Sequence, residues 1–330
     1  MKTIAVMVAV VAGVACAALG QQGSPGGPPT GSGGTAAAPG DGARAGESAG
    51  RERRMPPPRE VEWSVYLRGM TSTAADLDGT SGDVGYSRVS AGLSVGIPIG
   101  HRSQLDVNPE YEFLSYDFHA TAGLLPTPGE PWGDIHRESL SVRFATQEDE
   151  RLRWYVGAQI ASSAEDGADW DDSLTFGVLG GVGYALSPTL QVGAGIGITT
   201  QLEDDPLPIP VLTVNWQFAE GWRLSNERRL GLGVFYHPSE TWRVGAMAWY
   251  ERNAFRLDDD GPLPGGVGRD RRVPIAALVT FTPSERMRVE AEAGLLVFQE
   301  YRFEDSGGNK VAEVDADPSA FIAIKLTYSF

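Results

Sequence analysis

The last eleven residues of the chain alternate strictly between two kinds of side chain. Ile322, Ile324, Leu326, Tyr328 and Phe330 are apolar, and the residues between them are polar or small. Successive side chains of a β-strand point to opposite faces, so the segment is predicted to be a strand with one apolar face. A soluble sheet has no need to end on an aromatic residue, whereas a strand of a transmembrane barrel has one face in lipid and the other in a lumen. The terminal pattern therefore favours a membrane barrel over a soluble sandwich.

Residues 1–20 have the composition of a secretory signal peptide. One basic residue precedes an apolar run over residues 4–14, which is too short to cross a membrane as a helix. Cys16, the one cysteine, would leave with this peptide, because Gly13 stands where a lipoprotein signal needs a large aliphatic residue. The mature chain is then predicted to lack cysteine, which suits an oxidising periplasm and excludes thiol chemistry.

Residues 21–60 are rich in Gly, Pro, Ala and Ser and show no apolar periodicity. Such a segment buries too little apolar surface to offset the entropy lost on ordering. It is predicted to be a disordered periplasmic linker, either a passive tail or a tether to a periplasmic partner. The remaining 61–330 form one domain.

Alternating runs recur throughout this domain. They predict strands at 61–70, 89–97, 102–118, 134–146, 152–160, 172–186, 188–200, 207–218, 222–226, 229–237, 241–257, 270–282, 285–303 and 318–330. Tight turns alternate with long, acidic, Gly- and Pro-rich loops at 71–83, 119–133, 163–171 and 258–269, as in transmembrane barrels. The predicted fold is all-β, a single antiparallel up-and-down transmembrane β-barrel of about 14 strands, or about 12 if 222–237 is one bent strand.

Tryptophans provide a separate indication of the membrane boundary. In the predicted topology Trp63, Trp154, Trp216, Trp222 and Trp242 all lie at the periplasmic ends of their strands. Amphipathic rings gather at the level of the lipid headgroups, whereas a soluble sandwich would keep its large aromatic residues in mid-strand. The distribution predicts an interfacial girdle.

Charged residues follow the other parity of the strands and are predicted to point inward. A lipid-facing Arg would cost about 2–4 kcal/mol at the bilayer midplane, whereas a lumen tolerates charge. The predicted lumen-lining residues are Arg68, Arg88, Glu110, Glu112, Arg143, Arg153, Arg243, Arg272, Arg288, Glu290, Glu292 and Lys325. Because barrels of about 8 strands are filled and those of 16–18 hold a channel, a wet pore and a salt-bridged plug both remain open.

Catalytic and cofactor motifs are weak. Ser48 and Ser94 both occur in G-x-S-x-G, but the first lies in the linker and the second within a strand, where no nucleophile elbow forms. His136 and Ser139 have opposite parity, so they cannot act as a pair across one face. The four histidines lack metal-binding spacing. We expect no enzyme activity, no cofactor and no structural metal.

The loops carry dense carboxylates at 76–83, 165–172 and 258–260. Carboxylates at this density could collect a hard divalent cation, although solvated and mutually repelling loops are the simpler interpretation. A formal net charge of −16 argues against a nucleic-acid partner, which needs clustered Lys and Arg.

Two resemblances extend this interpretation. The terminal segment, with Tyr328 and Phe330, resembles the C-terminal assembly signal of bacterial outer-membrane barrels, which implies the barrel-assembly machinery and outer-membrane lipid as partners. Residues 61–330 resemble an uncharacterised family of bacterial outer-membrane β-barrel proteins through this strand, the aromatic turns and residues 256–260. We expect a porin- or transporter-like barrel that passes small hydrophilic solutes. The alternative is a non-conducting structural or adhesive barrel whose acidic loops bind ions or partners.

Overall fold

Strands account for most of the chain in the computed structural model, which describes residues 60–228 and 230–330. The predicted signal peptide and all of the predicted linker except Glu60 lie outside the described residues. The strands are β1 (Glu62–Ser72), β2 (Ala75–Asp76), β3 (Asp83–Ile99), β4 (Ser103–His119), β5 (Asp134–Gln147), β6 (Leu152–Glu165), β7 (Leu174–Ser187), β8 (Leu190–Thr199), β9 (Leu207–Ala219), β10 (Trp222–Ser225), β11 (Gly231–Tyr236), β12 (Trp242–Trp249), β13 (Glu251–Arg256), β14 (Val267–Ser284), β15 (Met287–Glu304), β16 (Lys310–Ala316) and β17 (Ser319–Ser329). A 3-10 turn, η1 (Asp171–Ser173), precedes β7. In this described part, no helix is long and apolar enough to span a membrane.

All the strands belong to one sheet that closes on itself, because β1 pairs with β17 on one side and with β3 on the other. Three short strands extend a neighbour along the chain: β2 follows β1, β13 follows β12, and β16 precedes β17. The wall therefore has 14 strands, as predicted. The alternative of 12 is wrong, because β10 and β11 pair with each other as separate antiparallel strands.

Several strands differ from the prediction at the end of the barrel that carries the long loops. β2 forms within the predicted loop 71–83, and β3 begins at Asp83 rather than at residue 89. The predicted strand 241–257 is interrupted at Tyr250, where β12 gives way to β13. No strand is predicted at 304–317, but β16 forms there and pairs with the end of β15. Long hairpins project beyond the membrane at this end, so their pattern no longer follows the lipid-facing alternation.

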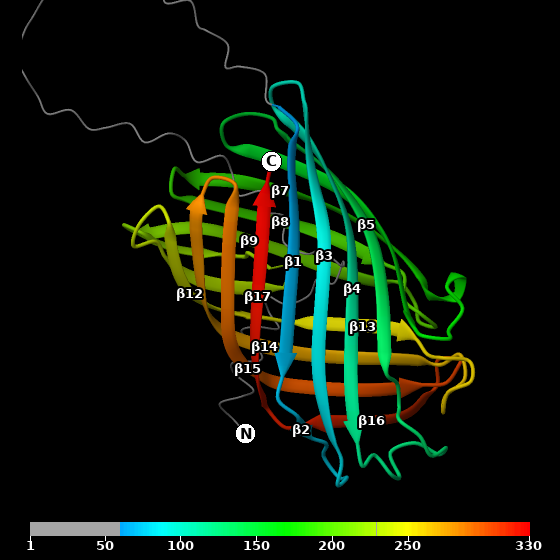
Figure 1. Cartoon of the computed structure of the whole chain (residues 1–330). Coiled ribbons are helices and arrows are strands. Elements are labelled where there is room, and N and C mark those ends of the chain that lie inside the picture. Colours follow the sequence, from blue (N-terminus) through cyan, green and yellow to red (C-terminus); the bar gives the residue numbers. More distant parts are fainter. Residues whose placement is uncertain (1–59, 229) are drawn as a thin grey trace, which may run out of the picture.

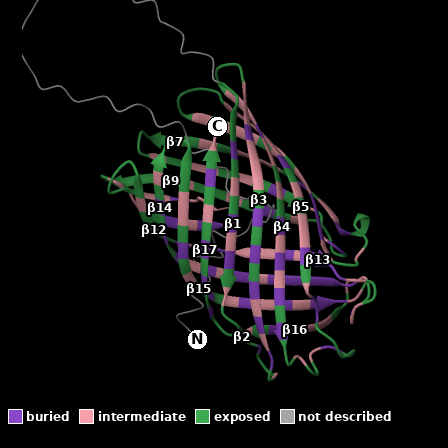
Figure 2. Cartoon of the chain, in the orientation of Figure 1, coloured by how far each residue is buried: buried purple, intermediate pink, exposed green. Residues whose placement is uncertain are grey.

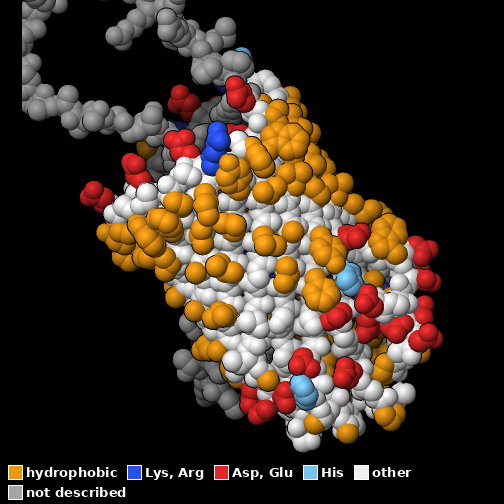
Figure 3. Space-filling view, viewed as in Figure 1, with side chains coloured by type: hydrophobic (Ala, Val, Ile, Leu, Met, Phe, Trp, Pro, Cys, Tyr) orange, Lys and Arg blue, Asp and Glu red, His pale blue; other side chains and the backbone are white. Residues whose placement is uncertain are grey.

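The barrel has two distinct ends (Figure 1). β1 begins and β17 ends at the same end, together with the tight turns, and the long loops lie at the other. We refer to these as the periplasmic and outer ends, because the termini of such barrels lie in the periplasm. Acidic side chains gather around the rim at the outer end, while apolar side chains cover the wall (Figure 3).

The lipid-facing wall ends in an aromatic girdle on the periplasmic side. Trp63, Trp216, Trp222 and Trp242 are each more than 40% exposed. Neighbouring strands bring their rings together, with Trp222 and Tyr236 at 4.9 Å and other pairs formed by Trp242 with Phe281 and Trp154 with Phe144, while Tyr328 and Phe330 pair along the end of β17. The large exposed area of these rings is stable at the headgroup level.

An apolar core fills the interior of the outer half, where buried residues concentrate (Figure 2). Trp132, which is 1% exposed, lies at its centre, with ring centroids 4.6 Å from Phe303, 5.0 Å from Phe255 and 5.7 Å from Tyr116. Trp132 belongs to the loop 119–133, which was predicted only as a long loop and which folds into the barrel. We call this cluster the aromatic plug.

The wall is incomplete on one side. The side-chain oxygen of Asn226 accepts a hydrogen bond from Val214 N at 2.7 Å, so the main-chain groups of even-numbered β9 residues point toward β10. β10 ends at Ser225, opposite Asn215, and β9 residues 207–214 pair with no further described strand on that side. Pro208 and Pro210 lie on this edge and have no N–H to leave unpaired.

Side chains bridge the gap between β9 and β13. The loop 200–206, before β9, contacts arginines of β13 and β14 on the opposite side: Gln201 contacts Arg252, Glu203 contacts Arg256 at 2.7 Å, and Asp204 contacts Arg269 at 2.9 Å. We call this region the β9–β13 seam. Two ion pairs and one amide contact connect the two sides of the seam, whereas main-chain hydrogen bonds join neighbouring strands elsewhere in the wall.

Candidate functional site

A cavity of about 970 Å³ occupies the periplasmic half of the barrel. Its lining includes residues of the tight turns, such as Arg151, His237 and Glu240, so it reaches the periplasmic end. No residue of the long loops 71–83, 119–133 and 258–266 lines it. The aromatic plug therefore lies between this cavity, which we call the vestibule, and the outer end.

Ten of the twelve predicted lumen residues line the vestibule. They are Arg68, Arg88, Glu110, Glu112, Arg143, Arg153, Arg243, Arg288, Glu290 and Lys325. Arg272 and Glu292 do not line it and are instead buried among other side chains of the barrel interior, 1% and 4% exposed. The parity of the strands thus predicts that these charges face the interior, but it does not predict the depth at which each one lies.

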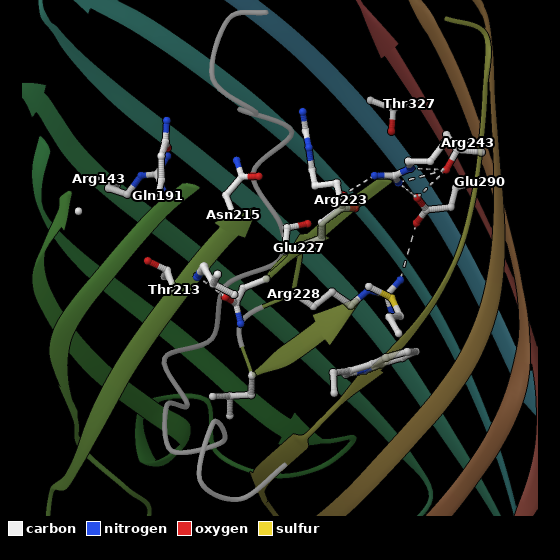
Figure 4. Close-up of a pocket in the computed structure, with 18 of the residues that line it drawn as sticks. Arg143, Gln191, Thr213, Asn215, Arg223, Glu227, Arg228, Arg243, Glu290 and Thr327 are labelled. Carbon is white, nitrogen blue, oxygen red and sulfur yellow. Dashed lines mark hydrogen bonds and ion pairs between the residues drawn. The ribbon is translucent and has the colours of Figure 1, made fainter. Parts of the chain in front are cut away.

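One side of the vestibule is a network of ion pairs (Figure 4). Arg243 of β12 donates to Glu290 of β15 at 2.9 Å and also contacts Glu227. Arg228 contacts Glu292 and lies 3.8 Å from Glu290, and its guanidinium stacks 4.2 Å from the ring centre of Trp249. Glu227 and Arg228 belong to the loop between β10 and β11, which therefore turns inward across the lumen.

Closer to the outer end, a second network separates the vestibule from the aromatic plug. Asp270, which is fully buried, pairs with Arg272 and accepts hydrogen bonds from the Tyr116 hydroxyl and, at 2.8 Å, from the Asn253 amide. The Arg272 guanidinium lies 3.6 Å above the Tyr86 ring. Arg269 and Glu304, each with a side chain 1% exposed, pair at 2.9 Å. These charges are stable in the interior because each faces an opposite charge.

A third set of pairs joins the two networks. Arg88 contacts Glu251 at 3.1 Å and lies 3.8 Å from Glu112. Glu251 also accepts a hydrogen bond from the Trp249 indole at 2.7 Å. Because Glu251 belongs to β13, these contacts link β13 to β3 and β4, with which it does not pair through main-chain hydrogen bonds.

Sequence reasoning missed several members of these networks. Asp270 shares the parity of Arg272 two residues later, so the same pattern would have identified it. Glu227 and Arg228 lie in a loop that folds inward, and Glu251 follows the break in β12. Strand parity predicts neither the inward loop nor the position of Glu251, because both depend on where regular strand pairing stops.

His237 lies at the periplasmic mouth of the vestibule, in the turn after β11. Burial lowers the pKa of its imidazole, an effect that its contact with the Gly221 carbonyl partly offsets. The ring is therefore neutral at neutral pH and adds no charge to the vestibule.

The remaining candidate residues form no catalytic arrangement. His136 contacts the Tyr111 hydroxyl at 2.6 Å and Asp166 at 3.0 Å on the outer surface of the wall, while Ser139 lines the vestibule. Ser94 lies within β3 and bonds to Asn108. Between residues 60 and 330, Arg229 apart, no group of three or more His, Cys, Asp or Glu side chains could hold a metal ion, so the described acidic loops contain no preformed cation site.

A closed antiparallel barrel with an apolar outer wall and an aromatic girdle is the form in which strands cross a lipid bilayer, since it leaves almost no backbone group unpaired. The protein is an outer-membrane β-barrel protein, as predicted.

No family model matches the sequence, and no curated protein matches it. Among solved structures the chain is similar to an outer membrane channel from Pseudomonas putida F1, with 10% identity and a TM-score of 0.46 over 86% of this chain and 100% of that one. It is also similar to a Pseudomonas aeruginosa FadL homologue (10% identity, TM-score 0.43, 81% and 89% covered) and to the Pseudomonas putida toluene transporter TodX (10%, 0.40, 82% and 89%). Likenesses at this level carry no argument about the solute. The resemblance to one particular barrel family stays a prediction.

Proposed function

We propose that the protein is a gated, non-enzymatic barrel of transporter type that admits small hydrophilic solutes through its vestibule. The observation that supports this most directly is the vestibule itself, a polar cavity of about 970 Å³ inside a membrane barrel. A barrel with a purely structural role would gain stability by filling this space, since packed side chains contribute dispersion energy that a wet cavity lacks.

The aromatic plug is the gate of this proposal. A solute in the vestibule meets the Asp270 network and then Trp132 before it could reach the outer end. Passage therefore requires the loop 119–133 to leave the barrel interior, and the wild-type protein should spend most of its time closed.

Planar-bilayer recording of two variants tests the proposal. Removing the ring in Trp132→Ala should convert rare, brief openings of the wild-type protein into frequent ones. Trp170→Ala is the matched control, because Trp170 is 57% exposed on the outer surface and should leave the current unchanged. Emptying a core site by Trp→Ala costs about 3–5 kcal/mol. Each sample is therefore first checked for a folded barrel by its different gel migration before and after boiling.

A second comparison tests the ionic character of the path. Replacing Arg153 or Arg288 by Glu should shift the selectivity of the open state toward cations, because both side chains line the vestibule. The absence of any current through both the wild-type protein and folded Trp132→Ala would contradict the proposal.

The second candidate function is a non-conducting structural barrel. The buried networks around Asp270 and Arg269 favour it, because they pack the outer half as a soluble core would. In this case charge reversal in the vestibule should lower thermal stability and produce no current in any variant.

A further inference from the structure

One panel of the vestibule wall has no acidic residue. Strands β7, β8, β9 and β10 contain neither Asp nor Glu. Every carboxylate that lines the vestibule comes from elsewhere: from β4, β13, β15, the loop 226–230 or the tight turns. The side chains that the panel places in the cavity include Gln191, Thr213, Asn215 and Arg223, all of which can donate hydrogen bonds.

The register brings these donors together. Gln191 on β8 is directly opposite Asn215 on β9, which is opposite Ser225 on β10, two residues from Arg223. In Figure 4, Arg143 and Gln191 lie at the left of the cavity, Asn215 and Arg223 lie near its centre, and the paired Arg243 and Glu290 lie at the right.

Glycines keep the neighbouring row open. Arg153 on β6 is opposite Gly183, which is opposite Gly193, which is opposite Thr213. Two positions without side chains therefore stand between Arg153 and Thr213 in this row. The Thr213 side chain lies over Gly193, where a Cβ would clash with its hydroxyl oxygen, whereas a Cβ on Gly183 would have its nearest atom at 3.8 Å, so the open space over the panel is at Gly183.

The vestibule is positive in an otherwise acidic protein. Among the described residues, twelve Arg or Lys and seven Glu line it, a surplus of five positive charges, whereas the whole chain has a net charge of −16. A cleft with one sign of charge and low-dielectric walls concentrates ions of the opposite sign.

The arginines differ in how far this charge is already compensated. Arg143 pairs with Asp106 at 2.8 Å and Arg243 with Glu290 at 2.9 Å. Arg223 and Arg288 form no ion pair with any residue in 60–228 or 230–330. Arg223 is the one of these two that belongs to the acid-free panel.

We propose that this panel is a binding site for a small oxyanion, a carboxylate or phosphate group, with Arg223 as its charged ligand and Gln191, Asn215 and Thr213 as neutral donors. A guanidinium presents a planar fork of N–H groups that matches two oxygens of such an anion, and amide NH₂ groups complete the coordination. The inference rests on the proposed function in that the bound anion is the transported solute, yet binding itself requires no open gate.

Isothermal titration calorimetry on the full-length protein in a zwitterionic detergent tests the site, with sodium phosphate and sodium succinate as separate probes at low ionic strength. The wild type should bind at least one of them, and added NaCl should weaken binding. Arg223→Gln should weaken it about tenfold, the ordinary size of one charge-assisted hydrogen-bonded contact, and Arg223→Lys should lie between the two. Binding of phosphate alone would identify a phosphate site, binding of succinate alone a carboxylate site, and binding of both a site that accepts either oxyanion.

Arg286→Gln is the matched control, because Arg286 lies in the exposed turn between β14 and β15 and does not line the vestibule. It removes the same charge and should leave binding unchanged. Equal weakening by Arg286→Gln and Arg223→Gln, no binding of either anion, or equally tight binding of spermidine would overturn the site. A protein that binds the anion but never conducts would retain the site and refute the transport proposal, so the two failures are distinguishable.

Discussion

The buried pair of Asp270 and Arg272 gives the strongest prediction about stability. Asp270 is fully buried and Arg272 is 1% exposed, so the Asp270→Ala substitution leaves the guanidinium without its carboxylate in the barrel interior. Breaking a buried pair by removing one partner costs about 3–5 kcal/mol. The Tyr116 hydroxyl and the Asn253 amide also lose their acceptor. We expect the free energy of unfolding to fall by at least this amount.

The double variant Asp270→Ala with Arg272→Met separates the charge from the hydrogen bonds. It removes both charges and leaves two polar groups without their acceptor, which costs about 1–3 kcal/mol. The double variant should therefore be more stable than the single one. A double-mutant cycle isolates this interaction energy, because the two residues are in direct contact.

Urea unfolding of the folded barrel in detergent, followed by tryptophan fluorescence, measures these differences. Glu313→Ala is the matched control, since its pair with Lys310 is at 3.6 Å between side chains 38% and 52% exposed. An exposed pair contributes at most about 1 kcal/mol. A loss below about 1 kcal/mol for Asp270→Ala, or a double variant less stable than the single one, would refute the reasoning.

Three further predictions concern assembly, the glycines of β7 and β8, and the β9–β13 seam. Deleting Phe330, or Tyr328→Asp, should lower the amount of folded, heat-modifiable barrel in the outer membrane far more than Ser329→Ala does. Both aromatic side chains lie on the exposed face of the closing strand. Equal yields of the three variants would contradict a role for these residues in recognition by the assembly machinery. Gly195→Ala should destabilise the barrel by about 1–3 kcal/mol, since a Cβ there would lie 2.6 Å from the Gly180 carbonyl oxygen, whereas Gly183→Ala, with its nearest atom at 3.8 Å, should be tolerated in the same urea assay. Replacing Glu203 by Gln and Asp204 by Asn should lower the free energy of unfolding in the same urea assay, and Glu220→Gln, in an exposed turn, should not. Equal effects of the two changes would mean that the ion pairs do not hold the seam.

The sequence predicted the parts of the fold that lipid dictates. The alternation of Ile322, Ile324 and Leu326 survives because each lipid-facing residue is exposed, between 42% and 63%. The girdle tryptophans were predicted for the same reason. The aromatic plug could not be predicted, because Trp132 lies in a loop whose sequence has no period, and its burial depends on contacts with Phe255 and Phe303 more than 100 residues away. The break at Tyr250 and the inward turn at Arg228 likewise depend on partners on distant strands.

The number of strands explains why the barrel is half filled. Wall side chains alone fill a barrel of about 8 strands, and barrels of 16–18 strands retain an aqueous channel. With 14 strands the wall cannot fill the interior by itself, so the outer half is filled by the loop 119–133, which folds into the barrel, together with inward side chains of the outer parts of the strands such as Phe255 and Phe303. β13 pairs with β14 and, at Arg256, with Ala164 of β6 rather than with β9, so the outer part of β9 has no strand partner on that side, which accounts for the seam and for the prolines on its edge. The loop 119–133 does not line the periplasmic half, and among the described residues the vestibule remains there.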